Sequence, residues 1–71
     1  MEFPSNFGFK YSEEYNEWQK VRGDGILLII WERSNIDWEL SYLDKDDNMI
    51  SMCIGDEDYI IDHFLNHGKS Y

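Results

Sequence analysis

Three short stretches in the middle of the chain have the hydrophobic pattern of β-strands. The first, 26–31, is an uninterrupted run of Ile, Leu and Trp residues that follows a turn signal ending at Gly25. A short run of this kind, bounded by glycine, predicts a central strand over residues 26–33 that is buried on both faces. From residue 36 onward apolar and polar residues alternate, which predicts a half-buried antiparallel strand over residues 36–44.

The alternation also predicts which side chains face the core. In the second stretch the residues expected to point inward are Ile36, Trp38, Leu40 and Tyr42. The intervening Asp37, Glu39 and Ser41 are expected on a wet, acidic face of the sheet. A third stretch alternates over residues 49–54, and its core-facing residues are predicted to be Ile50, Met52 and Ile54.

A helix is predicted over residues 56–67, directly after the last strand. Asp56 can cap its first turn, and Glu57 and Asp58 suit the positive end of the helix dipole. Gly68 is placed to end the helix. The apolar stripe expected to bury this helix consists of Ile60, Ile61, Phe64 and Leu65.

The first 25 residues fit two patterns. Tyr11, Tyr15 and Trp18 have helical spacing, whereas the segment from Phe7 to Tyr11 alternates like a strand. We expect an extended arm over residues 1–11 and a possible helix over 12–21, and the pattern leaves helix and strand open for residues 7–21.

These elements predict one small α+β domain over residues 1–71, in the order α-β-β-β-α. Its centre would be a three-stranded antiparallel β-meander with the C-terminal helix packed on one face, preceded by the arm and the short helix. A chain of 71 residues is near the lower size limit for one unstapled core. Cys53 is the one cysteine, so no internal disulfide is possible, and twelve aromatic residues must supply much of the packing.

Composition bears on location. The single cysteine and an acidic N-terminus without a basic, apolar leader favour a reducing, cytoplasmic setting. The longest apolar run is too short to span a bilayer, so no membrane association is expected. The chain contains neither Ala nor Thr, which points to an AT-rich coding genome such as that of a low-GC bacterium or its phages.

No catalytic or metal-binding motif stands out. Residues 44–48 begin like a calcium loop, but Met49 stands where that loop needs glycine, which favours a solvated turn. His63 and His67 have the spacing of zinc ligands on a helix, yet no third ligand is specified. Cys53 lies mid-strand and is expected to be a small packed hydrophobe. We therefore predict a protein that is not an enzyme and carries neither metal nor cofactor.

Charge is the strongest functional clue. The chain has 15 acids and 6 bases, a formal net charge of −9. Nine of the acids lie within residues 37–62, where the one base is Lys45. Such a field attracts basic surfaces and repels nucleic acid and anionic membranes. If the acids lie on one outer surface, a row of carboxylates could imitate the phosphates of a nucleic acid strand.

These features predict a small acidic binding protein, an inhibitor or antagonist that occupies a basic, nucleic-acid-binding surface of a protein target. It would not bind nucleic acid directly. The residues expected to contact the partner are Asp37, Glu39, Asp44, Asp46, Asp47, Asp56, Glu57, Asp58, Phe7 and Phe9. The two phenylalanines belong to the predicted arm and would act as exposed anchors.

Three alternatives remain open. The chain could be a structural or assembly protein that forms a homodimer through its aromatic arm or an open sheet edge. It could also be an immunity-type partner of one basic toxin, which would share the electrostatics of an antagonist. The charge could, finally, serve solubility alone.

Overall fold

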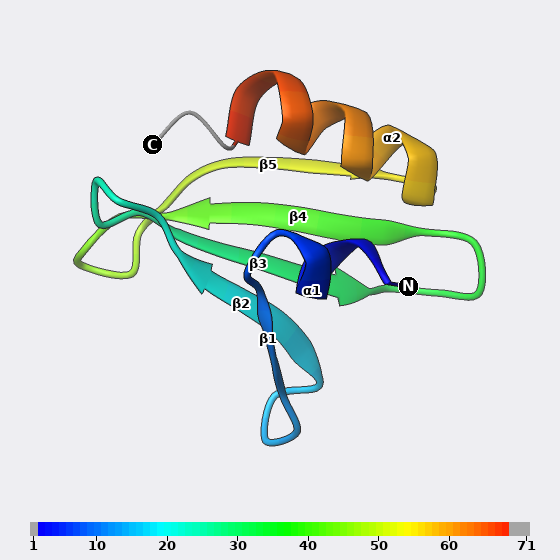
Figure 1. Cartoon of the computed structure of the whole chain (residues 1–71), viewed down its shortest axis with the longest axis horizontal. Helices are drawn as coiled ribbons and strands as arrows, with labels where there is room; N and C mark the ends of the chain where they lie inside the picture. The colour runs from blue at the N-terminus through cyan, green and yellow to red at the C-terminus, as the bar shows by residue number, and fades with distance from the viewer. Residues whose placement is uncertain (1, 69–71) are drawn as a thin grey trace.

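A computed structural model describes residues 2–68 and contains a five-stranded antiparallel sheet with helices on one face (Figure 1). The sheet follows a short N-terminal helix and precedes a C-terminal helix that ends in a π-helical turn. In chain order the elements are α1 Phe3–Asn6, β1 Lys10–Ser12, β2 Glu17–Val21, β3 Leu27–Glu32, β4 Trp38–Leu43, β5 Met49–Gly55, α2 Glu57–His63 and η1 Phe64–Gly68.

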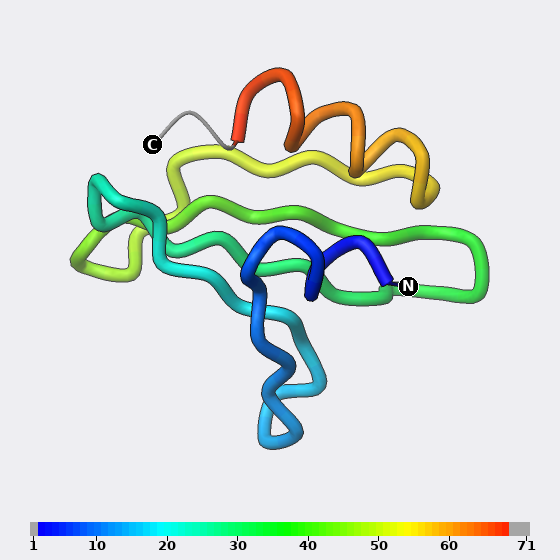
Figure 2. Tube along the Cα trace, in the orientation of Figure 1, coloured from blue at the N-terminus to red at the C-terminus, as the bar shows by residue number. Residues whose placement is uncertain are grey.

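The strands pair in chain order, β1-β2-β3-β4-β5, so the sheet is a meander in which each strand returns beside its predecessor (Figure 2). The α+β class, the antiparallel sheet and the C-terminal helix are confirmed; a short N-terminal helix is also present, but at residues 3–6 instead of 12–21. The predicted count of three strands is wrong, because two further strands precede β3. Strands β3, β4 and β5 lie where the sequence predicted strands, and β3 is the central one.

The helix expected over residues 12–21 is wrong: this segment forms the hairpin of β1 and β2. Tyr11 lies opposite Trp18 across the hairpin, with ring centroids 5.3 Å apart. The same two residues suggested helical spacing, but they meet across two strands. Asn16 completes the turn with a φ of 53°, a left-handed conformation that Asn tolerates better than most residues. The hairpin projects away from the rest of the sheet (Figure 2).

The core lies between the helices and one face of the sheet. Ile30 and Leu40 are fully buried neighbours on β3 and β4, and Cys53 lies beside Leu40 on β5. Ile60 and Phe64 cover them from the C-terminal helix. Of the predicted helical stripe, Leu65 is exposed and does not belong to this core.

The N-terminal segment is folded into the core, which corrects the expectation of an extended arm. A proline in the first turn starts α1, where its missing N–H costs nothing. Phe3 and Phe9 are buried, and both rings pack on Phe64, at 5.4 and 5.5 Å between centroids. Phe7 packs on the same ring at 5.5 Å and is half-buried. With Phe9 only 3% exposed, the two predicted anchors serve the protein's own core.

The predicted orientation of β5 is also wrong. Ile50, Met52 and Ile54 are exposed, whereas Cys53 points into the core. The pairing of Leu40 with Cys53 sets this orientation, and a one-residue shift in register reverses every side chain of a strand. A β-bulge between Tyr42 and Leu43 interrupts the pairing near the start of β5.

Two smaller differences concern β3 and β4. Ile36 is not in β4 but in the loop before it, where its side chain is exposed. The central strand is fully buried on one face only: Leu28 and Ile30 lie in the core, whereas Ile29 and Trp31 are half-buried on the opposite face. No helix of residues 2–68 packs on that opposite face, and we call it the open face.

Candidate functional site

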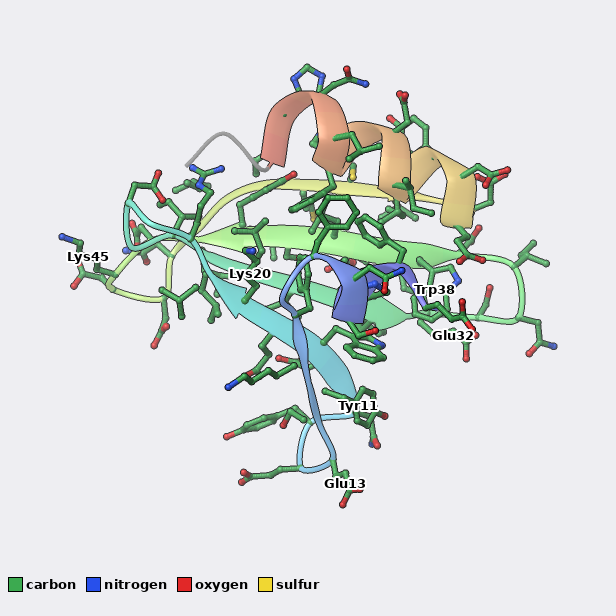
Figure 3. The ribbon with its side chains drawn as sticks, viewed as in Figure 1. Tyr11, Glu13, Lys20, Glu32, Trp38 and Lys45 are labelled. Atoms are coloured by element: carbon green, nitrogen blue, oxygen red, sulfur yellow. The ribbon has the colours of Figure 1, made fainter. Side chains whose placement is uncertain are left out.

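The acidic residues predicted to form one surface lie at two ends of the sheet. The first group follows β4, in the turn to β5: Asp44, Asp46 and Asp47. The second group surrounds the start of α2: Asp37, Asp56, Glu57 and Asp58. Trp38 pairs with Gly55, which places Asp37 and Asp56 at the same end. Figure 3 labels Lys45, the base in the turn that carries the first group, and, at the opposite end, Glu32 and Trp38 beside the second. The length of β5 therefore separates the groups.

The first group is built on a tight turn rather than a calcium loop. Asp44 accepts hydrogen bonds from the main-chain N–H groups of Asp46 and Asn48, both at 2.9 Å, and these bonds lower the pKa of its carboxyl. Asp47 has a φ of 63°. Because the carboxylate of Asp44 is hydrogen-bonded within the turn, Asp46 and Asp47 supply the charge that faces outward.

The second group is fixed by the start of α2. The side chain of Asp56 accepts a hydrogen bond from the main-chain N–H of Tyr59 at 2.9 Å and caps the helix, as predicted. Glu57 and Asp58 occupy the exposed first turn. Their charges are stabilised by the helix dipole and remain directed to solvent.

Glu39 is not on a wet acidic face, although its strand position was predicted correctly. Its side chain accepts hydrogen bonds from Trp31 Nε1 at 3.1 Å and from the Ser41 hydroxyl at 2.7 Å. The Arg33 guanidinium lies 3.7 Å from the same carboxylate. Glu39 is 8% exposed, so it is a satisfied buried carboxylate and cannot meet a partner.

The open face is largely apolar. Its strand positions are given by the register, in rows that run across β2 to β5: Val21, Leu27, Leu43 and Met49; Gln19, Ile29, Ser41 and Met52; and Trp31, Glu39 and Ile54. Eight of these eleven side chains are apolar. Val21 is 70% exposed, and Met49, Met52 and Ile54 are exposed as well. This combination of apolar character and exposure is typical of interaction surfaces.

Strand β5 is also an edge of the sheet. Among the strands between residues 2 and 68 it pairs only with β4. Its seven residues, Met-Ile-Ser-Met-Cys-Ile-Gly, include no charged residue and no proline, and most of them are exposed. Long, uncharged edges are usually protected in natural proteins, because their unpaired main-chain groups can pair with another chain.

A cleft of about 410 Å³ lies between the start of β5 and the end of the C-terminal helix. It is lined by Arg22, Tyr42, Ile50, Ser51, His63 and His67. The Tyr42 hydroxyl lies 3.1 Å from Nδ1 of His63, and the two imidazole rings are 4.9 Å apart. Arg22 holds the end of the helix to the sheet, because it donates to the Gly68 carbonyl and pairs with Asp24.

Burial shifts the pKa of two groups in this cleft, Tyr42 and His63. Burial raises the pKa of Tyr42 to about 12, so its hydroxyl keeps its proton. Burial, together with the neighbouring His67, lowers the pKa of His63, which favours the neutral imidazole. The Tyr42 hydroxyl can therefore donate to Nδ1 of a neutral His63. This arrangement binds the helix to the sheet.

The cleft does not assemble a recognisable catalytic centre. Cys53 is buried, and burial raises the pKa of its thiol, which makes it a poor nucleophile. Within residues 2–68, no three or more His, Cys, Asp or Glu side chains are grouped so that they could hold a metal ion. No helix in this part of the chain is long and apolar enough to cross a membrane.

Five of the eight acids that the sequence predicted to contact a partner are exposed, but sequence reasoning missed the open face, the free edge of β5 and the cleft. The histidine spacing drew attention to His63 and His67, but their partner Tyr42 lies on another element and has no local signal. The chain matches no protein-family model, no curated protein and no solved structure among those with which it was compared.

Proposed function

We propose that this chain is a small, non-enzymatic binding protein that occupies a basic surface of a protein partner. The observation that supports the proposal best is the arrangement of its charges. Two exposed acidic groups stand at the ends of β5, and between them lie an uncharged strand and the apolar open face. A basic surface with an apolar centre would satisfy both features.

The remaining charges act in both directions, because Lys45 is exposed in the turn that carries the first acidic group and Lys10 is exposed on β1. Three of the cations are engaged within the protein: Lys20 donates to the Phe7 carbonyl, Arg22 pairs with Asp24, and Arg33 lies beside Glu39. Glu13 and Glu14 add acids at the tip of the β1–β2 hairpin (Glu13 is labelled in Figure 3). Approach of a basic partner would be accelerated by this field and slowed by salt.

Within this function, we propose that the chain acts as an inhibitor of its partner. Many basic protein surfaces bind nucleic acid, and an acidic protein bound there would exclude it. The separation of the acids into two groups favours contact at two points over imitation of a continuous row of phosphates. The single free thiol of Cys53 suits action in the reducing cytoplasm.

The test is affinity capture from a low-GC bacterial lysate with matched variants of the chain. Asp46→Asn with Asp47→Asn removes the exposed charge of the first group, and Glu13→Gln with Glu14→Gln removes equal charge from the hairpin tip. We expect the first pair to lose a basic protein that the wild type and the second pair retain. The partner should be captured at about 50 mM salt and released at about 300 mM.

The captured protein is then tested for competition with nucleic acid. If it binds nucleic acid and our chain displaces that nucleic acid, the antagonist role is supported. Partners that are retained equally by all variants and at high salt would contradict the proposal, because binding would not depend on charge.

A homodimer is less well supported. The aromatic residues that were expected to join two copies are packed in the core, around Phe64. The sheet edge is available, but the like charges at its two ends oppose self-association.

A further inference from the structure

We propose that the outer edge of β5 accepts an extended segment of the basic partner as a sixth strand of the sheet. The inference rests on the proposed function and names the binding mode. The segment would have an apolar centre and Lys or Arg residues at both of its ends. Addition of a strand to a free edge is a recurrent mode of peptide recognition, in which main-chain hydrogen bonds provide much of the affinity.

The main chain of β5 has the geometry that this mode requires. Alternate residues of an edge strand direct their N–H and C=O groups away from the sheet. Between residues 2 and 68 no second strand pairs with these groups. Seven residues at about 3.3 Å each give an edge of roughly 23 Å, long enough for several main-chain hydrogen bonds.

Side chains of the added strand would meet a different surface on each face of the sheet. On the open face its residues would lie beside Met52 and Ile54, both exposed and apolar. On the opposite face, residues near the start of β5 would lie beside Ser51 and the cleft that Ser51 shares with His63. Apolar side chains on the first face and small or polar ones on the second fit these surfaces.

Charge decides between a second copy and a basic partner. Antiparallel pairing of two β5 strands about Met52 would set Met49 of each copy opposite Gly55 of the other. The acidic turn of one copy would then adjoin Glu57 and Asp58 of its neighbour. Parallel pairing would bring each acidic group against its own equivalent. Both orientations place like charges together, which destabilises the pairing of two copies. The edge therefore disfavours self-association but remains open to a basic strand.

The experiment uses the full chain and a synthetic probe. The probe is a peptide of about eleven residues, Lys-Arg-Val-Thr-Val-Thr-Val-Thr-Val-Arg-Lys, whose alternation suits a strand with one apolar face. Binding is measured by calorimetry, and its site by amide chemical shifts and hydrogen exchange of the isotopically labelled protein. We expect shifts and new amide protection concentrated in residues 49–55.

Two N-methylated peptides test the main-chain hydrogen bonds. In a paired strand only every second residue directs its N–H to the neighbour. In one peptide we therefore methylate the main-chain nitrogens of the odd-numbered residues of the probe, and in the other those of the even-numbered residues. One of these peptides should bind at least about tenfold more weakly than the parent, and the other should bind nearly as well. Equal binding of both would show contact through charge alone and would overturn the inference, while the proposed function would stand.

Variants of the protein test the acidic ends. We expect two double variants each to lower the affinity for the probe by roughly fivefold at low salt: Asp46→Asn with Asp47→Asn, and Glu57→Gln with Asp58→Asn. Glu13→Gln with Glu14→Gln makes the same charge change at the far edge of the sheet and should have little effect. A probe with Glu in place of its Lys and Arg residues should not bind.

The remaining outcomes separate the two claims. Chemical-shift changes confined to residues outside 49–55, or no binding at about 1 mM probe, overturn the strand-addition inference. The proposed function is then tested by the affinity-capture experiment alone. In another outcome the probe binds at β5 and one N-methylated form does not, but a probe with neutral residues in place of its Lys and Arg residues binds equally well. The edge is then a docking site for a strand, and the charge-based function is contradicted.

Discussion

Glu39 shows how a single residue can have the expected position and an unexpected role. It lies on the face that the alternation assigned to it, but Trp31 and Ser41 donate hydrogen bonds to its carboxylate and neighbouring apolar side chains bury it. We expect Glu39→Ala to lower the free energy of unfolding by about 2–3 kcal/mol, because it leaves the indole N–H without its acceptor and removes a charged hydrogen bond. Chemical denaturation followed by tryptophan fluorescence measures this.

The control for Glu39 is Glu32→Ala, which removes an exposed acid from the adjacent strand. Its effect should lie within about 0.5 kcal/mol. If the two variants were equally stable, the hydrogen bonds to Glu39 would contribute nothing measurable.

His63 gives the protein a dependence on pH. Its pKa in the folded protein is lower than its ordinary value near 6.5, because burial and His67 disfavour the charged ring. The unfolded chain therefore binds the proton more readily, and stability falls as pH drops through about 6.5. Between pH 7.5 and 5.5 we expect the wild type to lose stability relative to His63→Gln, which cannot take up the proton.

This pH effect can be separated from the titration of other groups. Thermal unfolding of both proteins at each pH gives the difference directly, and changes common to both cancel. His67→Gln should raise the pKa of His63 by removing a neighbouring positive charge, which an NMR titration of the His63 ring would show. A parallel pH profile for wild type and His63→Gln would contradict the assignment.

At the scale of elements, the start of α2 combines a structural and an electrostatic role in Asp56. The side chain caps the helix through the Tyr59 N–H. We expect Asp56→Ala to destabilise the protein by about 1 kcal/mol, whereas Asp56→Asn keeps an acceptor at the cap and should cost little. Circular dichroism during thermal unfolding measures both variants, and an equal loss in the two would show that charge, not capping, is what Asp56 supplies.

Elements with strong local signals could be predicted from the sequence, and those defined by distant partners could not. The Gly-bounded run of β3 and the capped helix after Asp56 contain local residues that mark where each element begins or ends. Tyr11 and Trp18 fit helical spacing equally well, and only their meeting across a hairpin distinguishes the two. The orientation of β5 depends on its register with Leu40, which a local pattern of Ile, Met, Ser and Cys does not determine.

At the scale of the whole molecule, the acids are expected to control self-association. We expect the wild type to be monomeric at low salt, because pairing of two β5 edges brings acids together. A variant with Asp46→Asn, Asp47→Asn, Glu57→Gln and Asp58→Asn should self-associate measurably at about 100 μM. Sedimentation equilibrium distinguishes the two, and Glu13→Gln with Glu14→Gln serves as the control that stays monomeric. A wild-type dimer that persists at low salt would contradict this role of the acids.

The candidate site illustrates the same limit at this larger scale. Net charge and the local acid-rich segments could be counted from the sequence, and five of the eight acids predicted to contact a partner are exposed. Their division between two ends follows from the direction in which β5 runs, which links Asp47 to Asp56 over the length of a strand. The open face and the free edge depend on which face the helices cover, and that is a property of the assembled fold.

The packing of Phe3 and Phe9 on Phe64 has a consequence for how the chain reaches its fold. Every strand pairs with its neighbour in sequence, so the meander can form through short loop closures that cost little entropy. The phenylalanine cluster instead joins residues roughly sixty positions apart, and its closure is rewarded only when the sheet already holds the two ends near each other. The two terminal helices are thus expected to dock late in folding, and loosening this cluster should mainly accelerate unfolding and leave the folding rate almost unchanged.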